Sequence, residues 1–161
     1  MYENLALYID GEFISGGSRR EQDVHNPATG EVIGHLPHAT TEELDRALSA
    51  AQRAFESWKN VSPMEKSRIL LKVGDLTRER ADSIARNITL DQGKPLAETK
   101  GEVTRCVDHC DWHAEECRRI YGRVIPPRSA NVRQMVLREP IAVCAPLGRA
   151  AYGGMHSLPP T

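Results

Sequence analysis

One stretch of the sequence, Leu90–Tyr121, constrains the fold more than any other. It reads LDQGKPLAETKGEVTRCVDHCDWHAEECRRIY. Gln92-Gly93 marks a helix stop and Lys94-Pro95 a restart, since Gly is preferred just past one helix and Pro at the first position of the next. About 27 residues from Pro95 onward would form a helical rod of roughly 40 Å, against which much of the chain must pack. Its apolar and small residues recur at helical spacing, at Leu96, Val103, Val107, Cys110, Ala114, Cys117 and Tyr121.

Two pairs of short strands are predicted at the start of the chain, within residues 7–36. In the first pair, Asp10-Gly11 lies between apolar runs and supplies the two positive-φ positions of a type I′ turn. The second pair covers residues 23–26 and 31–36, with a turn at Asn26–Gly30 between them. We expect these strands to form a small edge sheet.

Further helices are predicted before the long one, so that helices occupy about residues 41–121. Thr40 caps the first, with Glu43 three residues on as a capping box. Ser62 caps the second, Pro63 takes its first position, and Glu65 closes the box. The third covers roughly residues 81–91. The inward faces are predicted at Leu44, Ala47, Leu48, Ala51, Phe55 and Trp58, then at Ile69, Leu70, Val73 and Leu76, then at Ile84, Ala85 and Ile88.

The pattern changes after Gly122, where the long helix is expected to end. Residues 123–125 read as extended, because Pro126 disfavours the helical conformation before it. Residues 132–139 partly alternate, as a half-exposed strand does, and Pro140 breaks the run. The short apolar run Ile141–Ala145 is typical of a buried parallel strand.

Composition narrows the class of protein. The 161 residues carry a net charge of −1, with 40% hydrophobic and 27% charged residues, as in a soluble globular protein. We expect no nucleic-acid partner, because the charge is balanced, and no membrane span, because no apolar run approaches about 18 residues. The first residues contain acids and lack the basic start of a signal peptide. The expected location is therefore the cytoplasm, where the four cysteines stay reduced.

Several motifs, in order along the chain, resemble the N-terminal part of an aldehyde dehydrogenase, and within that superfamily they are most similar to the succinate-semialdehyde dehydrogenase branch. The main motifs are Thr89–Glu98 (TLDQGKPLAE), Lys100-Gly101-Glu102, Ala114-Glu115-Glu116 and Arg119-Ile120-Tyr121-Gly122. Tyr8–Glu12 resembles the family's opening hairpin, and Asn26–Glu31 resembles the turn and strand that follow it. Arg138–Val143 resembles the entry to the first strand of the family's nucleotide-binding sheet.

The resemblance implies an α/β fold class: the helix-rich N-terminal part of the family's cofactor domain, with edge hairpins and part of the oligomerisation arm, as an incomplete domain. Residues 1–145 would be this region, with arm strands at 123–139 and the first sheet strand at 140–145. The complete enzymes oxidise an aldehyde to a carboxylate with NAD or NADP. A cysteine thiolate attacks the carbonyl, a glutamate acts as general base, and an asparagine with a backbone N–H binds the oxyanion.

None of these catalytic parts can be placed in this sequence. After the strand that matches 141–145, the family reads Thr/Ser-Pro-Trp-Asn-Phe-Pro, whereas residues 146–161 read PLGRAAYGGMHSLPPT. We expect this non-matching tail to be disordered and to result from a frameshift or a truncation. We assign no catalytic, cofactor-binding or metal-ligating residue and expect no tight cofactor binding. The resemblance implies a family that oxidises a semialdehyde, similar to succinate semialdehyde, to a carboxylate. We expect this chain by itself to be inactive. Assembly of the chain into a homo-oligomer is possible. An alternative function is a non-catalytic helical module that binds a protein partner.

One cysteine near the end of the sequence and a group of cysteines and histidines in the long helix are candidate reactive sites. Cys144 is interpreted as a buried thiol rather than a nucleophile, because it lies in an apolar run without a Gly-Gln-x-Cys-type context. Cys106, His109, Cys110, His113 and Cys117 share one helical face and raise the alternative of a zinc site. One helix aims an i, i+4 pair at a metal ion but cannot surround it with four ligands. Core cysteines beside surface histidines are the favoured interpretation.

Charged residues at the two ends of the long helix are the remaining candidate functional residues. Lys94 is unfavourable to the dipole at a helix start, so a structural contact with a neighbouring segment is the favoured explanation. Glu115 and Glu116 point about 100° apart and are expected to be solvated rather than to share a site. Arg118, Arg119 and Arg123 complement the dipole at the helix end.

Overall fold

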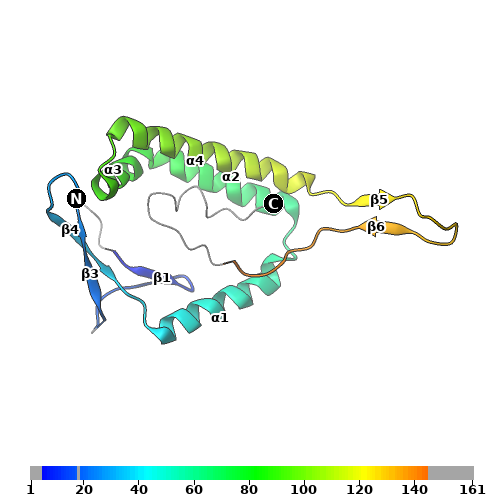
Figure 1. Cartoon of the computed structure of the whole chain (residues 1–161), viewed down its shortest axis with the longest axis horizontal. Helices are drawn as coiled ribbons and strands as arrows, with labels where there is room; N and C mark the ends of the chain where they lie inside the picture. The colour runs from blue at the N-terminus through cyan, green and yellow to red at the C-terminus, as the bar shows by residue number, and fades with distance from the viewer. Residues whose placement is uncertain (1–4, 18, 145–161) are drawn as a thin grey trace.

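Four helices make up about half of the computed structural model, which describes residues 5–17 and 19–144 (Figure 1). They are α1 (Thr41–Trp58), α2 (Pro63–Glu79), α3 (Ala81–Gln92) and α4 (Leu96–Glu116), and a 3₁₀ turn at Cys117–Arg119 follows α4. Helices α2, α3 and α4 pack together as a bundle, whereas α1 lies apart from them (Figure 1). The expected helix-rich α/β architecture is confirmed.

Three antiparallel hairpins complete the fold, each a separate two-stranded sheet. Strands β1 (Leu7–Ile9) and β2 (Glu12–Ile14) pair first, then β3 (Glu21–His25) and β4 (Val32–Pro37), then β5 (Arg123–Ile125) and β6 (Gln134–Val136). In the first turn, φ is 55° at Asp10 and 85° at Gly11, which confirms the predicted turn with two positive φ angles. The two N-terminal hairpins are thus confirmed, although they do not join into one sheet.

The predicted helix boundaries are largely confirmed. The Thr40 hydroxyl accepts from the Glu43 N–H, and the Glu43 carboxylate accepts from the Thr40 N–H, so both bonds of the capping box are present. Ser62 caps α2 by accepting from the Glu65 N–H, with Pro at the start of the helix. Gly93 ends α3 with φ of 70°. Pro95 is the N-cap of α4 rather than its first residue.

Helix α4 is the centre of the bundle, as the sequence predicts, but it is shorter than expected. Its buried residues include Val103, Val107, Cys110 and Ala114 from the predicted face. The α-helix ends at Glu116 and tightens into the 3₁₀ turn, which is a common way to satisfy the last carbonyl groups. The prediction that the helix reaches Tyr121 was therefore wrong, and Tyr121 is 69% exposed.

The face that α2 presents to α4 differs from the predicted one. The buried residues of α2 are Ser67 and Gly74, whereas Ile69 and Val73 from the predicted stripe are each 43% exposed. A Cβ atom added at Gly74 would lie 3.6 Å from Cys110 Cβ. Small residues thus let the two helices approach closely. The predicted stripe holds at Leu70 and Leu76, which are half-buried, and is wrong at Ile69 and Val73.

Helix α1 carries its predicted apolar stripe but buries none of its residues. Leu44, Leu48 and Trp58 are 55%, 57% and 45% exposed. The helix is tied instead to the β1–β2 hairpin by ion pairs, with 2.8 Å between Arg53 and Asp10 and 2.5 Å between Arg46 and Glu12. The periodicity was predicted correctly, but the burial was not.

The segment after α4 forms a hairpin of β5 and β6 that projects away from the helices, and all its residues are exposed (Figure 1). The predicted strand over residues 132–139 is shorter, Gln134–Val136. A buried strand was predicted at 141–145, and the structure describes residues 141–144 of it. The prediction is wrong for these residues, because they form no strand and Ile141 is 97% exposed. A parallel strand needs neighbours for its backbone groups, and none lies beside this segment in the described chain. Ala145 and the predicted tail lie outside the described residues.

Candidate functional site

The seam between α2 and α4 holds a network of three charged side chains that joins the two helices. Arg78 lies on α2 and forms ion pairs with Asp75, at 2.8 Å, and with Asp111 on α4. A Cβ atom added at Gly74 would lie 3.1 Å from Asp111 Oδ1, so any larger residue would require this carboxylate to shift. This seam was not predicted from the sequence, although a glycine such as Gly74 within a helical pattern is a signal for close packing.

The predicted cysteine and histidine face of α4 is divided between core and surface. Cys110 is buried, Cys106 and Cys117 are half-buried, and His109 is exposed. Burial, reinforced by neighbouring Cys106, raises the pKa of the Cys110 thiol, so it is a poor nucleophile at neutral pH. Within residues 5–17 and 19–144, no group of three or more His, Cys, Asp or Glu residues is arranged to hold a metal ion.

Lys94 makes the structural contact that was predicted for it. Its ammonium group lies 2.5 Å from the Glu102 carboxylate, which is two turns into α4. Both side chains are about two-thirds buried or more, with exposed fractions of 31% and 24%. The pair offsets the unfavourable position of a cation at a helix start and fixes the turn between α3 and α4.

Glu115 and Glu116 share a partner, Arg119, although Glu115 is solvated as predicted, with its side chain 61% exposed. The Arg119 guanidinium lies 2.6 Å from Glu116 and 3.7 Å from Glu115. The hydrogen bond to Glu116 raises the pKa of Arg119 above its usual value. These contacts fasten the 3₁₀ turn onto the end of α4, so the group supports the base of the β5–β6 hairpin.

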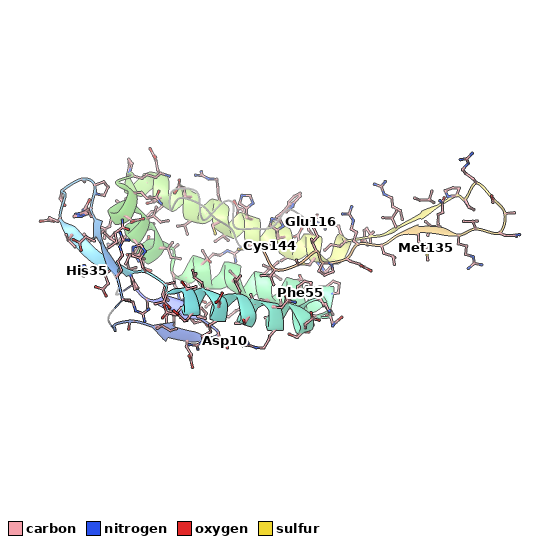
Figure 2. All side chains as sticks on the ribbon, turned by 60° about the horizontal axis from the view of Figure 1, so that its bottom comes forward. Asp10, His35, Phe55, Glu116, Met135 and Cys144 are labelled. Atoms are coloured by element: carbon pink, nitrogen blue, oxygen red, sulfur yellow. The ribbon has the colours of Figure 1, made fainter. Side chains whose placement is uncertain are left out.

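Cys144 is exposed, which contradicts the prediction of a buried thiol. Its Sγ lies 3.9 Å from the Ala142 carbonyl oxygen. The neighbouring Val143 lines an open hollow together with Leu48, Ser49 and Gln52 of α1. Figure 2 shows Cys144 beside the helices, whereas Met135 lies out on the projecting hairpin. The segment therefore runs back over α1 without forming a strand.

The described residues thus form a helical scaffold with exposed apolar side chains. All four cysteines are free thiols. No helix in the described part of the chain is both long enough and apolar enough to cross a membrane. Exposed apolar side chains include Leu44 and Leu48 on α1, Val124 and Met135 on the β5–β6 hairpin, and Phe13 on β2.

Comparison with known proteins gives this scaffold a family. Residues 13–148 match the model of the aldehyde dehydrogenase family. The chain is 42% identical over 138 residues to glutarate-semialdehyde dehydrogenase of Pseudomonas putida, which covers 86% of this chain and 29% of that protein. It is 40% identical over 145 residues to succinate-semialdehyde dehydrogenase [NADP(+)] of Escherichia coli, covering 90% of this chain and 30% of that protein.

A solved structure agrees with these sequence matches. The crystal structure of succinate-semialdehyde dehydrogenase from Burkholderia pseudomallei superposes with a TM-score of 0.83 at 39% identity, over 89% of this chain and 30% of that one. The chain thus spans less than a third of the length of these relatives, and it corresponds to an incomplete domain of their fold. With a family match over most of its length, the chain belongs to the aldehyde dehydrogenase family.

Proposed function

We propose that this chain is the N-terminal scaffold of an NAD(P)-dependent dehydrogenase for semialdehydes, and that the 161-residue chain by itself does not turn over aldehyde. The observation that carries the proposal is the family match over residues 13–148 combined with coverage of about 29% of the relatives. The relatives named above act on glutarate and succinate semialdehydes by name, which supports a semialdehyde that carries a second carboxylate as the substrate class.

The open surfaces support a scaffold role. Helix α1 presents Leu44 and Leu48 at more than half exposure, and an amphipathic helix normally buries such a stripe. In our proposal, this stripe packs against further parts of the dehydrogenase fold. The substrate, NAD or NADP would then be held mainly by residues that this chain does not supply, and tight cofactor binding to the isolated chain is not expected.

The projecting hairpin is proposed to be part of an oligomerisation arm, over residues 123–139. Among the described residues, β5 and β6 pair only with each other, so both outer backbone edges of the hairpin are open there. Open edges and exposed apolar side chains such as Val124 and Met135 favour pairing with another chain. A homo-oligomer formed through this arm is therefore part of the proposal. A cytoplasmic location is also proposed, supported by four free thiols.

A chimeric enzyme tests the scaffold role. The first 144 residues of this chain would replace the matching segment of the Escherichia coli succinate-semialdehyde dehydrogenase, and NADP⁺ reduction would be followed by absorbance with succinate semialdehyde. We expect a soluble chimera with measurable turnover, and we expect loss of turnover when Val107→Asp disrupts the bundle. A soluble, folded chimera without activity would count against the proposal.

The isolated chain is tested in parallel. Purified 161-residue protein would be incubated with succinate or glutarate semialdehyde and NAD⁺ or NADP⁺, with the complete Escherichia coli enzyme as positive control. We expect no reduced cofactor above background. Turnover by the isolated chain would overturn the inactive-fragment part of the proposal and leave the family assignment intact.

A second candidate function is a non-catalytic module that binds a complete homologue. The exposed α1 stripe and the open hairpin edges favour it, because both surfaces would match surfaces of a related chain. Co-purification with a complete aldehyde dehydrogenase from the same cells would support this function. If the isolated chain elutes as a monomer and captures no such enzyme, the module hypothesis fails.

A further inference from the structure

Two histidines lie one helical turn apart near the end of α4. His109 is exposed and His113 is half-buried. Their rings are stacked, with centroids 6.5 Å apart and planes inclined by 25°. An i, i+4 spacing places both imidazoles on one side of the helix, which is the arrangement that lets a pair of histidines reach the same ion.

These two rings are not engaged elsewhere. In the described part of the chain, neither imidazole takes part in a hydrogen bond or an ion pair, and their recorded interaction is with each other. The histidines of the β3–β4 hairpin differ. His25 Nδ1 lies 3.3 Å from the Gly30 carbonyl oxygen, and His35 Nδ1 lies 2.9 Å from Asp23 Oδ1. Both ring nitrogens of His109 and His113 are therefore available for a ligand, whereas the two hairpin histidines each have one ring nitrogen, Nδ1, already bonded.

We propose that His109 and His113 form a two-histidine site for a divalent late transition-metal ion such as Zn²⁺ or Ni²⁺, with water in the remaining positions. Neutral imidazole suits these ions, and metal–nitrogen distances of about 2.0–2.1 Å require the two rings to move closer together by side-chain rotation. The exposed position of His109 permits that rotation. The site has two protein ligands, in agreement with the lack of any larger ligand group among the described residues.

The neighbouring thiols are not part of the proposed site. Cys110 is buried, and the raised pKa of its thiol disfavours the thiolate that a metal ion would need. Cys106 and Cys117 are half-buried on adjacent turns, on the core side of the same stripe. Glu116 is held by Arg119, at 2.6 Å, and is thereby directed to the end of the helix.

An ion bound here would fasten the last turns of α4. The pair lies just before the helix gives way to the 3₁₀ turn at Cys117–Arg119, and the β5–β6 hairpin begins four residues later. Because a ligand that binds only the folded helix stabilises it, metal binding would reduce fraying at the base of the hairpin. The site is separate from the dehydrogenase role proposed above and does not depend on it.

Calorimetric titration of the reduced 161-residue protein with Zn²⁺ tests the site. His109→Gln and His113→Gln should each weaken binding about tenfold or more, equivalent to ~1.4 kcal/mol. The matched control is the double variant His25→Gln/His35→Gln, which should bind Zn²⁺ as the unmodified chain does. Circular dichroism would confirm that each variant keeps its helices. If His109→Gln, at the exposed position, leaves the affinity unchanged, the proposal is wrong.

Cobalt spectroscopy separates imidazole from thiol ligands. Co²⁺ bound through thiolate shows a strong sulfur-to-metal charge-transfer absorption, whereas Co²⁺ bound through imidazole and water does not. We expect no such absorption in the reduced protein, and we expect Cys106→Ser and Cys117→Ser to bind Zn²⁺ as tightly as the unmodified chain. A thiolate absorption that disappears in either serine variant would overturn the two-histidine assignment.

Discussion

Helices α4 and α1 are both amphipathic, yet only α4 buries its apolar face. Val103, Val107 and Cys110 are at most 6% exposed, whereas Leu44 and Leu48 on α1 are more than half exposed. Helix α4 has α2 and α3 against it, and α1 has mainly the small β1–β2 hairpin. Hydrophobic periodicity thus predicts which face of a helix is apolar, but it does not predict which element packs against that face.

The largest effect should come from placing a charge in each stripe in turn. Val107→Asp buries a carboxylate without a partner in the bundle and should cost about 3–5 kcal/mol, enough to unfold a marginal domain. Leu48→Asp makes the same chemical change on α1 and should alter the stability of the isolated chain by no more than about 0.5 kcal/mol. Urea denaturation followed by circular dichroism measures both. Equal losses would show that α1 is covered in solution.

A smaller effect is expected at the closest approach of α2 and α4. Gly74→Ala adds a Cβ atom 3.1 Å from Asp111 Oδ1 and 3.6 Å from Cys110 Cβ. The helices or the Asp111 side chain must shift, at a cost of about 1–3 kcal/mol, and the better helix propensity of Ala offsets about 1 kcal/mol of this cost, so the expected net loss is up to about 2 kcal/mol. On the uncovered helix, Ser49→Ala should be close to neutral. The midpoints of thermal unfolding compare the two, and a stabilised Gly74→Ala protein would mean that the seam is looser than described.

The smallest effect should come from the caps. Ser62→Ala and Thr40→Ala each remove a side-chain cap, a loss of about 1 kcal/mol for the helix concerned. For α2, which is packed, this loss should lower global stability. For α1 it should increase local fraying and leave the global transition unchanged. Amide hydrogen exchange distinguishes the two outcomes, and a global loss from Thr40→Ala would couple α1 to the bundle.

Local signals predicted most of the fold. The Asp10-Gly11 turn, the capping box at Thr40 and the stop at Gly93 each depend on a few neighbouring residues, and the structure confirms them. The motifs from Thr89 to Gly122 also predicted the family, which the comparisons confirm. Such features are fixed by backbone chemistry near one residue and do not need tertiary context.

The errors arose where a distant partner decides the outcome. The packing face of α2 is set by Ser67 and Gly74, because close approach to α4 matters there more than hydrophobicity. Ile141 belongs to an apolar run beside which residues 5–17 and 19–144 supply no strand, and it is exposed. The two-histidine pair on α4 was noticed in the sequence, but the lack of competing partners for the rings required the structure.

The arginines of the projecting hairpin give the molecule an uneven charge. Residues 118–138 contain six arginines and no acidic residue, although the whole chain has a net charge of −1. Two of the six, Arg118 and Arg119, lie in the 3₁₀ turn, and the others follow from Arg123 onward. The rest of the chain therefore carries more acidic than basic residues, so the charge is unevenly distributed despite a near-neutral isoelectric point of about 6.6. Encounters at this end should be accelerated by acidic partners and slowed by added salt, in a way that the net charge conceals.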